Sequence, residues 1–398
     1  MTEPLEPGLR GRDIVCVGFA DWQGGFWTNQ QHLMSRLAVH NRVLFVESLG
    51  LRRPQIAAGD ARRVARRIRG AIEGTRVHDR VHVLSPLVLP LHGNPWVRAL
   101  NRRLLTLSVS RAARRIGIRR PILWAYVPQA EVLIDSLDPA LVIYHCVDDI
   151  AAQKGVDATP FREAEQRFAS RADLVIASSS TLADRMREDS GNVLEAPNVA
   201  DTALFSTALQ SGPIDPALAE LPEPRLLFVG AITATKLDLG LLAELARIRP
   251  DWSLALVGSV GLGDPSTDIS SLAALPNVHM LGPRPQAELP AVLRGADVGL
   301  IPYLASPLTA SIFPMKVYEY LAAGLPVVST PLPALSEVSG IDVAGNASEM
   351  AARIDAALSE DDPGLRMERS RAAAGHSWES RLEQLNAAVR ELDPCVTS

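Results

Sequence analysis

The residues best suited to chemistry lie in one short segment, residues 313–329, which reads FPMKVYEYLAAGLPVVS. Its pattern predicts a loop, a helix, a glycine turn and a strand, with Lys316 in the first turns of the helix. Glu319 follows at i+3, so both side chains project from one helix face. A lysine at a helix N-terminus costs roughly 0.3–1 kcal/mol. A bound anion would offset that cost.

We expect such an anion to be held jointly by Lys316 and by backbone N–H groups of Ser311, Ile312 and Phe313. The carboxylate of Glu319 is then placed to accept hydrogen bonds from vicinal hydroxyls, such as those of a ribose. The alternative is an ordinary i,i+3 surface ion pair, which contributes only about 0.3–0.5 kcal/mol. The local pattern alone leaves both interpretations open.

A second group of titratable residues follows an apolar run at 141–144, where His145, Asp148 and Asp149 stand at the expected carboxyl end of a strand. Adjacent carboxylates repel each other, which raises the pKa of one of them and suits it to act as a general base. The alternative is that one aspartate caps the next helix. Asp21, in the loop that contains Gly24 and Gly25, is a further candidate base.

The elements that must position these residues alternate between strands and helices, which predicts an α/β fold with parallel sheets. Two such series appear, separated by the Pro-rich stretch 206–224. We therefore predict an N-terminal Rossmann-like domain (1–205), a linker (206–224), a C-terminal Rossmann-like domain (225–376) and a terminal helix (377–398) that packs back towards the first domain. The predicted strands lie at 13–18, 42–47, 81–84, 121–124, 141–144 and 174–177, and then at 225–230, 253–258, 278–282, 298–301 and 327–329.

Bulk composition limits the class of protein. At 398 residues the chain is long enough for two domains. No apolar run reaches the length of a membrane span, and the first residues lack the pattern of a secretory signal. Cys16, Cys146 and Cys395 are unclustered, so neither a disulfide framework nor a zinc site is expected. These features favour a cytoplasmic protein.

Charge is distributed unevenly along the chain. Residues 52–120 contain 17 Arg but only three acidic residues, Asp60, Glu73 and Asp79. One interpretation is a solvated basic face; another is attraction to an anionic lipid or acceptor. The apolar stretch 83–96 is followed by arginines, so residues 83–120 form either a strand, loop and helix or a peripheral contact with an anionic membrane. Nucleic acid is not expected as a partner, because aromatic residues are not interleaved with the arginines.

Taken with Gly230 to Lys236 upstream, the 313–329 segment resembles the donor site of GT-B glycosyltransferases of the family-four type. The P-x-K-x-x-E-Y-x-A-x-G-x-P-V pattern is similar to teichuronic-acid-type and xanthan glucuronosyltransferase-like enzymes. Two positions depart from the family-four pattern: Ala231 replaces its arginine and Ser311 replaces its first glutamate. The resemblance implies two Rossmann-like domains that face each other across a cleft.

By this resemblance Lys236 and Lys316 contact the donor diphosphate, Glu319 binds the ribose and Asp148 is the base, with His145 and Asp21 as alternatives. It also implies that the donor is a nucleoside diphosphate sugar. No metal-ligand cluster or D-x-D pattern is present in the sequence, so we expect no metal or other cofactor. Inversion is favoured, because Ser311 replaces the first glutamate and a candidate base is available. The acceptor is a hydroxyl of a small molecule or of a lipid-linked or polysaccharide chain. An epimerase or phosphorylase with the same donor site, and a non-catalytic nucleotide-sugar-binding protein, remain alternatives. The remaining donor-site candidates are Gly24, Gly25, Gly230, Gly258, Gly282, Arg284, Tyr303, Thr309, Ser311 and Ile312.

Overall fold

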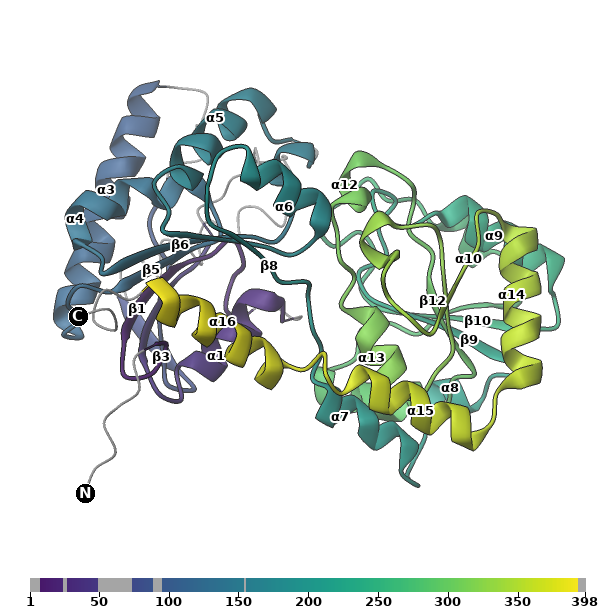
Figure 1. Ribbon diagram of the computed structural model, residues 1–398. Helices are drawn as coiled ribbons and strands as arrows, with labels where there is room; N and C mark the ends of the chain where they lie inside the picture. Colours follow the sequence, from purple (N-terminus) through teal and green to yellow (C-terminus); the bar gives the residue numbers. More distant parts are fainter. Residues whose placement is uncertain (1–7, 24–26, 49–73, 89–94, 154, 393–398) are drawn as a thin grey trace, which may run out of the picture. The chain divides into compact units, whose positions relative to one another are not determined.

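The computed structural model describes residues 8–23, 27–48, 74–88, 95–153 and 155–392. The chain divides into two compact units: unit 1 comprises Met1–Pro197 with Leu382–Ser398, and unit 2 comprises Asn198–Arg381. Each unit has one sheet in which almost every neighbouring pair of strands is parallel, with helices packed on both faces (Figure 1). The α/β fold expected from the sequence is therefore present in both halves.

Unit 1 has an eight-stranded sheet with the order β3-β4-β2-β1-β5-β6-β7-β8. Only the β3–β4 pair is antiparallel. Its elements are β1 (Asp13–Val17), α1 (Asn29–Leu37), β2 (Arg42–Val46), β3 (Thr75–His78), β4 (Val81–Leu84), α3 (Pro95–Arg115), β5 (Ile122–Ala125), η1 (Pro128–Leu133), α4 (Ile134–Leu137), β6 (Leu141–Cys146), η2 (Ile150–Ala152), α5 (Ala158–Ala169), β7 (Leu174–Ala177), α6 (Ser180–Arg187) and β8 (Val193–Glu195).

Helix packing explains why the strands of unit 1 are apolar along their whole length. Helix α3 packs Leu105 and Val109 against Val15 and Leu44 on one face of the sheet. Helix α1 lies on the opposite side of the sheet, as Figure 1 shows. A strand that is covered on both faces buries successive side chains in both directions, so its sequence is a continuous apolar run and does not alternate.

Unit 2 has a six-stranded, all-parallel sheet with the order β11-β10-β9-β12-β13-β14. Its elements are α7 (Thr202–Ser206), η3 (Thr207–Leu209), α8 (Pro216–Ala219), β9 (Arg225–Val229), α9 (Leu239–Ile248), β10 (Ser253–Val257), α10 (Ser270–Ala273), β11 (Val278–Met280), η4 (Gln286–Glu288), α11 (Leu289–Arg294), β12 (Val298–Ile301), α12 (Pro307–Ala310), α13 (Lys316–Ala322), β13 (Val327–Ser329), η5 (Pro333–Leu335), β14 (Ile341–Val343), α14 (Ala347–Glu360) and α15 (Pro363–Ala373).

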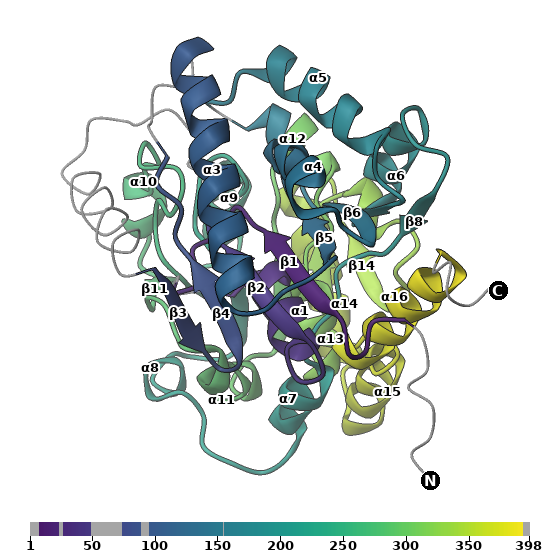
Figure 2. The same cartoon turned by 90° about the vertical axis from the view of Figure 1, so that its left-hand side faces the viewer.

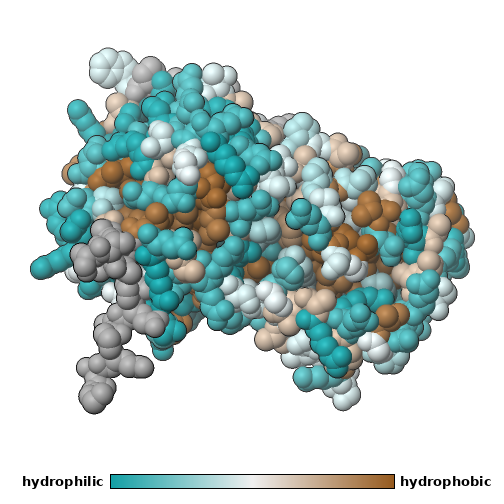
Figure 3. Space-filling model, viewed as in Figure 1, coloured by the Kyte–Doolittle hydropathy of each residue, from teal (hydrophilic) through white to brown (hydrophobic). Residues whose placement is uncertain are grey.

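Two apolar clusters cover the two faces of this second sheet. Helices α9 and α14 pack on one face through residues such as Leu242 and Ile354. Helices α13, α11 and α7 pack on the other through residues such as Val317, Val292 and Phe205. The surface seen in Figure 3 is mainly hydrophilic, and its apolar residues form separate patches. Most of the apolar side chains are therefore inside the two units.

The structure corrects the prediction of a linker at 206–224. This stretch contains η3 and α8, and α7 ends at its first residue. Ala208 and Leu218 are buried in the core of unit 2, and so is Phe205 of the adjoining α7. The boundary between the units lies earlier, between Pro197 and Asn198. The sequence pattern did not indicate α7, η3 and α8, because each of these short elements places only one or two apolar side chains in the core.

The terminal helix α16 (Trp378–Leu392) begins in unit 2 and is grouped with unit 1 from Leu382 onwards. Its Asn386 side chain accepts a hydrogen bond from the backbone N–H of Leu9 at 2.7 Å. Strands β3, β8 and β14 were not predicted from the sequence. Each is an edge strand of three or four residues with few buried side chains, so it lacks the apolar run that marks a central strand.

Candidate functional site

Lys316 and Glu319 form an ion pair on α13, as their i,i+3 spacing predicts. Lys316 is the first residue of this helix. The Glu319 side chain is only 6% exposed and the Lys316 side chain 23%. The pair is thus largely removed from solvent, which distinguishes it from an ordinary surface ion pair. A buried carboxylate needs such a partner, because removing an unpaired charge from water costs several kcal/mol.

Tyr320 fixes the position of α13 against the sheet. Its hydroxyl oxygen accepts a hydrogen bond from the backbone N–H of Val229, at 2.8 Å, at the end of β9. The Tyr320 ring lies against Gly299 of β12, where a Cβ would stand 2.5 Å from the ring. Tyr320 is not among the site residues predicted from the sequence. The signal for it is the second tyrosine of the YEY triplet, which immediately follows Glu319 on the buried side of the helix.

The loop that carries Lys236 is joined to the loop that follows β12. The backbone N–H of Leu304 donates to the carbonyl of Lys236 at 2.8 Å, and that of Asp238 donates to Pro302 at 2.9 Å. Leu237 and Tyr303 form an isolated antiparallel bridge between the same two loops. The structure therefore brings two predicted donor-site residues, Lys236 and Tyr303, into adjacent loops at the carboxyl edge of the unit 2 sheet.

Two predicted glycines meet at this edge. Gly258 has a φ of +159°, and a Cβ there would lie 1.7 Å from the carbonyl oxygen of Gly230. The N–H of Gly230 in turn donates to Val257 at 2.9 Å. Only glycine can occupy position 258, because the two loops approach too closely for any side chain. Packing of the loops therefore accounts for Gly258 whether or not a ligand approaches it.

The expectation of free amides at 311–313 is corrected for two of the three residues. The N–H of Ser311 donates to Leu308 at 3.4 Å and the N–H of Ile312 donates to Thr309 at 3.1 Å, which completes the end of α12. Both side chains are buried as well. A short helix ends immediately before these residues and uses their amides for its own last carbonyls.

Thr309 has a structural task in the same turn. Its hydroxyl accepts a hydrogen bond from the N–H of Ser306 at 3.1 Å and donates to the carbonyl of Leu304. The side chain is fully buried. Ser311 donates to the carbonyl of Pro307 at 3.4 Å. These two hydroxyls hold the turn that leads towards α13.

Arg284 is directed into its own unit. Its guanidinium forms an ion pair with Asp215 at 2.7 Å and donates to the carbonyl of Leu281 at 2.7 Å. The hydrogen bond from Arg284 holds the pKa of Asp215 below its ordinary value. Asp215 also caps α8, so this pair ties the loop after β11 to that helix. Gly282, by contrast, has a φ of +71° and open space where a Cβ would stand.

In unit 1 the two adjacent aspartates after β6 have different environments. Asp149 is buried and caps η2, accepting a hydrogen bond from Ala152 at 3.3 Å. Its carboxylate also pairs with Arg162 at 2.6 Å and Arg185 at 3.1 Å. Asp148 is only partly buried. The predicted division, in which one aspartate is a cap, is thus confirmed for Asp149, and the two arginines offset the expected repulsion between the carboxylates.

Glu165 completes this charged cluster. It accepts a hydrogen bond from the Tyr144 hydroxyl at 2.6 Å and pairs with Arg162 at 3.1 Å and Arg185 at 3.3 Å. Burial, together with the charge of Glu165 and the hydrogen bond to it, raises the pKa of Tyr144 well above its ordinary value, so the phenol remains a donor. Glu165 is not among the site residues predicted from the sequence. Its signal is a glutamate on the apolar stripe of α5 between Phe161 and Phe168.

The structure places His145 inside the sheet. Its ring is stacked on Tyr126, with centroids 4.8 Å apart, and its side chain is 2% exposed. Its Nδ1 accepts a hydrogen bond from the indole N–H of Trp124 at 3.3 Å. His145 is therefore more deeply buried than Asp148. Sequence position alone could not separate them, because both follow the same strand.

Asp21 lies in the loop after β1, which is anchored at several points. The N–H of Trp22 donates to Glu47 at 2.7 Å, and the carbonyl of Asp21 accepts a hydrogen bond from the Gln31 side chain at 3.2 Å. Asp21 is partly exposed. Gly24 and Gly25 lie outside the described residues.

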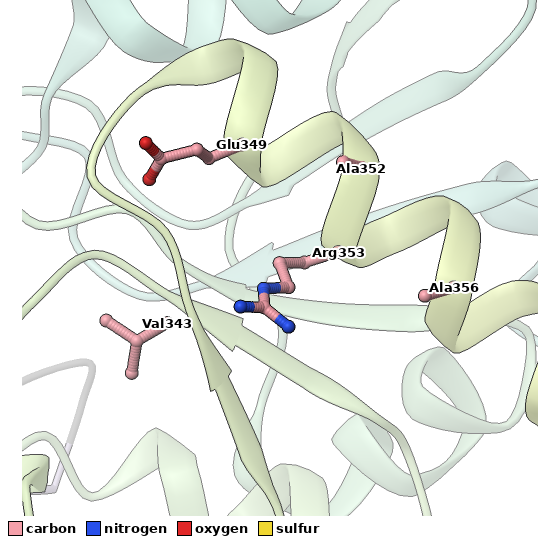
Figure 4. Close-up of a pocket in the computed structure, with 5 residues that line it drawn as sticks. All are labelled: Val343, Glu349, Ala352, Arg353 and Ala356. Atoms are coloured by element: carbon pink, nitrogen blue, oxygen red, sulfur yellow. The ribbon is translucent and has the colours of Figure 1, made fainter.

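Two surface hollows contain none of the predicted site residues. One, of about 320 Å³, lies beside α14 and is lined by Val343, Glu349, Ala352, Arg353 and Ala356 (Figure 4). Its polar groups serve the fold, because Glu349 accepts a hydrogen bond from the N–H of Gly345 and Arg353 pairs with Asp342. The other lies on α3. Within the described ranges, no group of three or more His, Cys, Asp or Glu could hold a metal ion.

Lys236, Lys316 and Glu319 of unit 2 lie in a segment that is similar to known proteins. Residues 223–360 match the family model of the glycosyl transferases group 1. This segment of unit 2 is therefore similar to the group 1 glycosyltransferases. The match includes Gly230, Lys236, Lys316 and Glu319, whereas the candidate bases Asp148, His145 and Asp21 lie outside it.

The chain is also 34% identical over 233 residues to "Putative teichuronic acid biosynthesis glycosyltransferase TuaH" of Bacillus subtilis (strain 168). This alignment covers 55% of the chain and 57% of that protein. The chain spans about half the length of the curated relatives it matches. The predicted resemblance to teichuronic-acid-type enzymes is confirmed by this relative.

Solved structures identify the fold of the whole chain. Sucrose-phosphate synthase from Thermosynechococcus elongatus matches 96% of the chain and 99% of its own, with a TM-score of 0.69 at 18% identity. HepE of Anabaena in complex with UDP-glucose matches 96% of the chain and all of its own, with a TM-score of 0.67 at 16% identity. The fold of the chain is GT-B, as the sequence predicts.

Proposed function

We propose that the protein transfers a sugar from a nucleoside diphosphate sugar to an acceptor hydroxyl. The observation that carries the proposal is the largely buried Lys316–Glu319 pair on α13, inside the group 1 family segment. In the donor complex Lys316 turns to the diphosphate and Glu319 accepts hydrogen bonds from the ribose hydroxyls. Lys236 supplies the second cation for the diphosphate from the adjoining loop.

Asp148 is the proposed base. It takes the proton of the acceptor hydroxyl while that oxygen attacks the anomeric carbon, and the bond from this carbon to the diphosphate oxygen breaks. The negative charge passes to the leaving diphosphate, where the two lysines stabilise it. We place the reaction in the metal-independent and inverting class, because these lysines can supply the positive charge and a carboxylate is available to act as base.

The donor and the acceptor are proposed by chemical class. UDP-sugars are the first donors to test, because the similar HepE structure contains UDP-glucose. A hydroxyl of a growing polysaccharide or of a glycolipid is the first acceptor class, in line with the teichuronic acid relative. A small secondary-metabolite acceptor is the alternative. Cytoplasmic localisation remains a proposal, supported by the free thiols of Cys16 and Cys146.

Donor binding is tested by a thermal-shift panel of UDP, GDP, TDP and their sugars. A ligand at 100 times its Kd adds about 2.7 kcal/mol to stability, so the cognate nucleotide raises the Tm. Lys316→Ala is expected to weaken nucleotide affinity at least about 10-fold, by loss of a charge-assisted contact. Arg353→Ala removes one cation from α14 of the same unit, away from the predicted donor residues, and serves as the control. Unchanged affinity in Lys316→Ala refutes the donor-site assignment.

Turnover separates the transferase from the alternatives. Release of nucleoside diphosphate that depends on an acceptor supports transfer, whereas acceptor-independent isomerisation of the sugar supports an epimerase. Binding without turnover supports a non-catalytic protein. The anomeric configuration of the product, read by NMR, tests inversion, and retained activity in EDTA tests metal independence. A product with retained configuration removes the base role from Asp148.

A further inference from the structure

Among the described elements of unit 1, helix α3 is the most basic. Its 21 residues, Pro95–Arg115, include six arginines and no acidic residue. Arg114 and Arg115 stand in the last turn, where cations complement the helix dipole. A surface helix normally carries both signs of charge on its solvent side. Because every charged residue of α3 is positive, the helix has a positive electrostatic potential along its length, which attracts an anionic partner.

The core-facing side of α3 is fixed by Leu105, Val109 and Ala112, which pack on the sheet. Helical periodicity of 3.6 residues then places one row of residues opposite the core. That outer row, named here the α3 outer row, consists of Trp96, Leu100, Arg103, Leu107, Arg111 and Arg114. Figure 2 shows α3 crossing the face of unit 1 that is turned to the viewer.

The apolar members of the α3 outer row are unusually exposed. Trp96 is 85% exposed, Leu107 68% and Leu100 45%. Contact between water and large apolar side chains is unfavourable, and covering them with an apolar partner lowers the free energy. Trp96, Leu100 and Leu107 therefore place exposed apolar area on the same helix face as the arginines of the outer row.

The basic members complete the pattern. Arg103, Arg111 and Arg114 form no ion pair or hydrogen bond with the described residues through their side chains. A hollow of about 570 Å³ beside them is lined by Leu107, Arg111, Arg114 and Arg115. Three guanidinium groups around one hollow suit a phosphate group, because arginine binds phosphate oxygens in a bidentate manner.

We infer that the α3 outer row lies flat on a bilayer of anionic phospholipid, with Trp96, Leu100 and Leu107 inserted at the interface and the arginines bound to lipid phosphates. The combination argues for this partner, because the arginines supply charge complementarity and the leucines supply buried apolar area. No described helix is long and apolar enough to cross a membrane, so the contact is peripheral. The inference does not depend on the proposed transferase activity.

The test is co-sedimentation of the full chain with phosphatidylcholine vesicles, with and without phosphatidylglycerol. We expect binding to the anionic vesicles only, and its loss at high salt, since the Debye length falls from about 10 Å at 0.1 M to about 3 Å at 1 M. Arg103→Glu/Arg111→Glu should reduce the partition coefficient by at least about 25-fold, at roughly 5-fold for each arginine lost. Inorganic phosphate at the same phosphate concentration should not displace the protein.

The matched control is Arg247→Glu/Arg371→Glu, which makes the same change in net charge on exposed helical residues of unit 2. It should bind vesicles as the wild type does. Insertion is read by quenching of tryptophan fluorescence with brominated lipid, which should fall in Trp96→Phe. Each variant is first checked for an unchanged Tm. Equal binding to neutral vesicles, equal loss in the control pair, or quenching that is unchanged in Trp96→Phe overturns the inference.

Discussion

At the scale of single residues, neighbours in sequence have different tasks. Asp148 and Asp149 are adjacent, yet Asp149 is buried against Arg162 and Arg185 while Asp148 is partly exposed. Lys316 and Glu319 form an ion pair with each other. Chemical type therefore identifies the candidates, and burial and partners decide which of them is available for a substrate.

Exchange of each aspartate for asparagine separates these tasks. Asp148→Asn removes the proposed base, so kcat should fall by about 10²–10⁴-fold with little change in stability. Asp149→Asn removes a charged partner from two arginines, so the free energy of unfolding should fall by about 2–3 kcal/mol. The measurements are kcat and urea denaturation of both variants. A near-wild-type kcat in Asp148→Asn contradicts its assignment as base.

At the scale of elements, short helices are held in place by side chains that are not themselves proposed to bind substrate. Helix α13 has only seven residues, yet it carries Lys316 and Glu319. Its position depends on Tyr320, which reaches from the helix to the end of β9. Helix α8 depends in a similar way on the Asp215–Arg284 pair. Single side-chain contacts to a strand or to a neighbouring loop thus hold these short helices in place.

Tyr320→Phe tests the anchoring of α13. It leaves the buried N–H of Val229 without its acceptor, which should lower the free energy of unfolding by about 1–3 kcal/mol. If α13 shifts as a result, nucleotide affinity should fall as well. Tyr320 itself is buried against the sheet, so a loss of affinity would come from the shift of α13. Thermal denaturation and nucleotide titration measure the two effects. A large stability loss with unchanged affinity would show that Tyr320 supports the core without positioning the site.

The Asp215–Arg284 pair predicts a pH dependence of stability. The pKa of Asp215 is lower in the folded chain than its ordinary value of 3.8, chiefly because Arg284 donates a hydrogen bond to it. Its contribution to stability is therefore present above about pH 4 and is lost as the pH falls through the folded pKa. Asp215→Asn should make the acid side of the stability curve shallower. Curves of equal slope for variant and wild type would exclude this contribution.

At the scale of the whole molecule, helix α16 is divided between the two units. Unit 1 combines residues from two separate parts of the sequence, and α16 reaches it after the chain has completed unit 2. Leu385 and Val389 of this helix are buried, and Asn386 accepts a hydrogen bond from Leu9. The stability of unit 1 therefore depends on residues that follow unit 2 in the sequence.

Leu385→Ala tests this dependence. Truncation of a fully buried leucine should cost about 2–5 kcal/mol of unfolding free energy. Glu383→Ala, at an exposed position of the same helix, is the matched control and should cost less than about 0.5 kcal/mol. Urea denaturation measures both. Equal small losses would show that the helix end contributes little to the unit.

The sequence by itself determined the central strands, the two α/β halves and the Lys316–Glu319 spacing, because these depend on local apolar runs and helical periodicity. It missed Tyr320 and Glu165, and it interpreted 206–224 as a linker. Only the tertiary structure shows that Asp148, Asp149 and His145 differ in burial and partners, since these differences arise from Arg162, Arg185 and Trp124 on other elements. Residues from distant parts of the chain set the burial and the charged surroundings of each of these side chains. A local sequence pattern does not identify those residues.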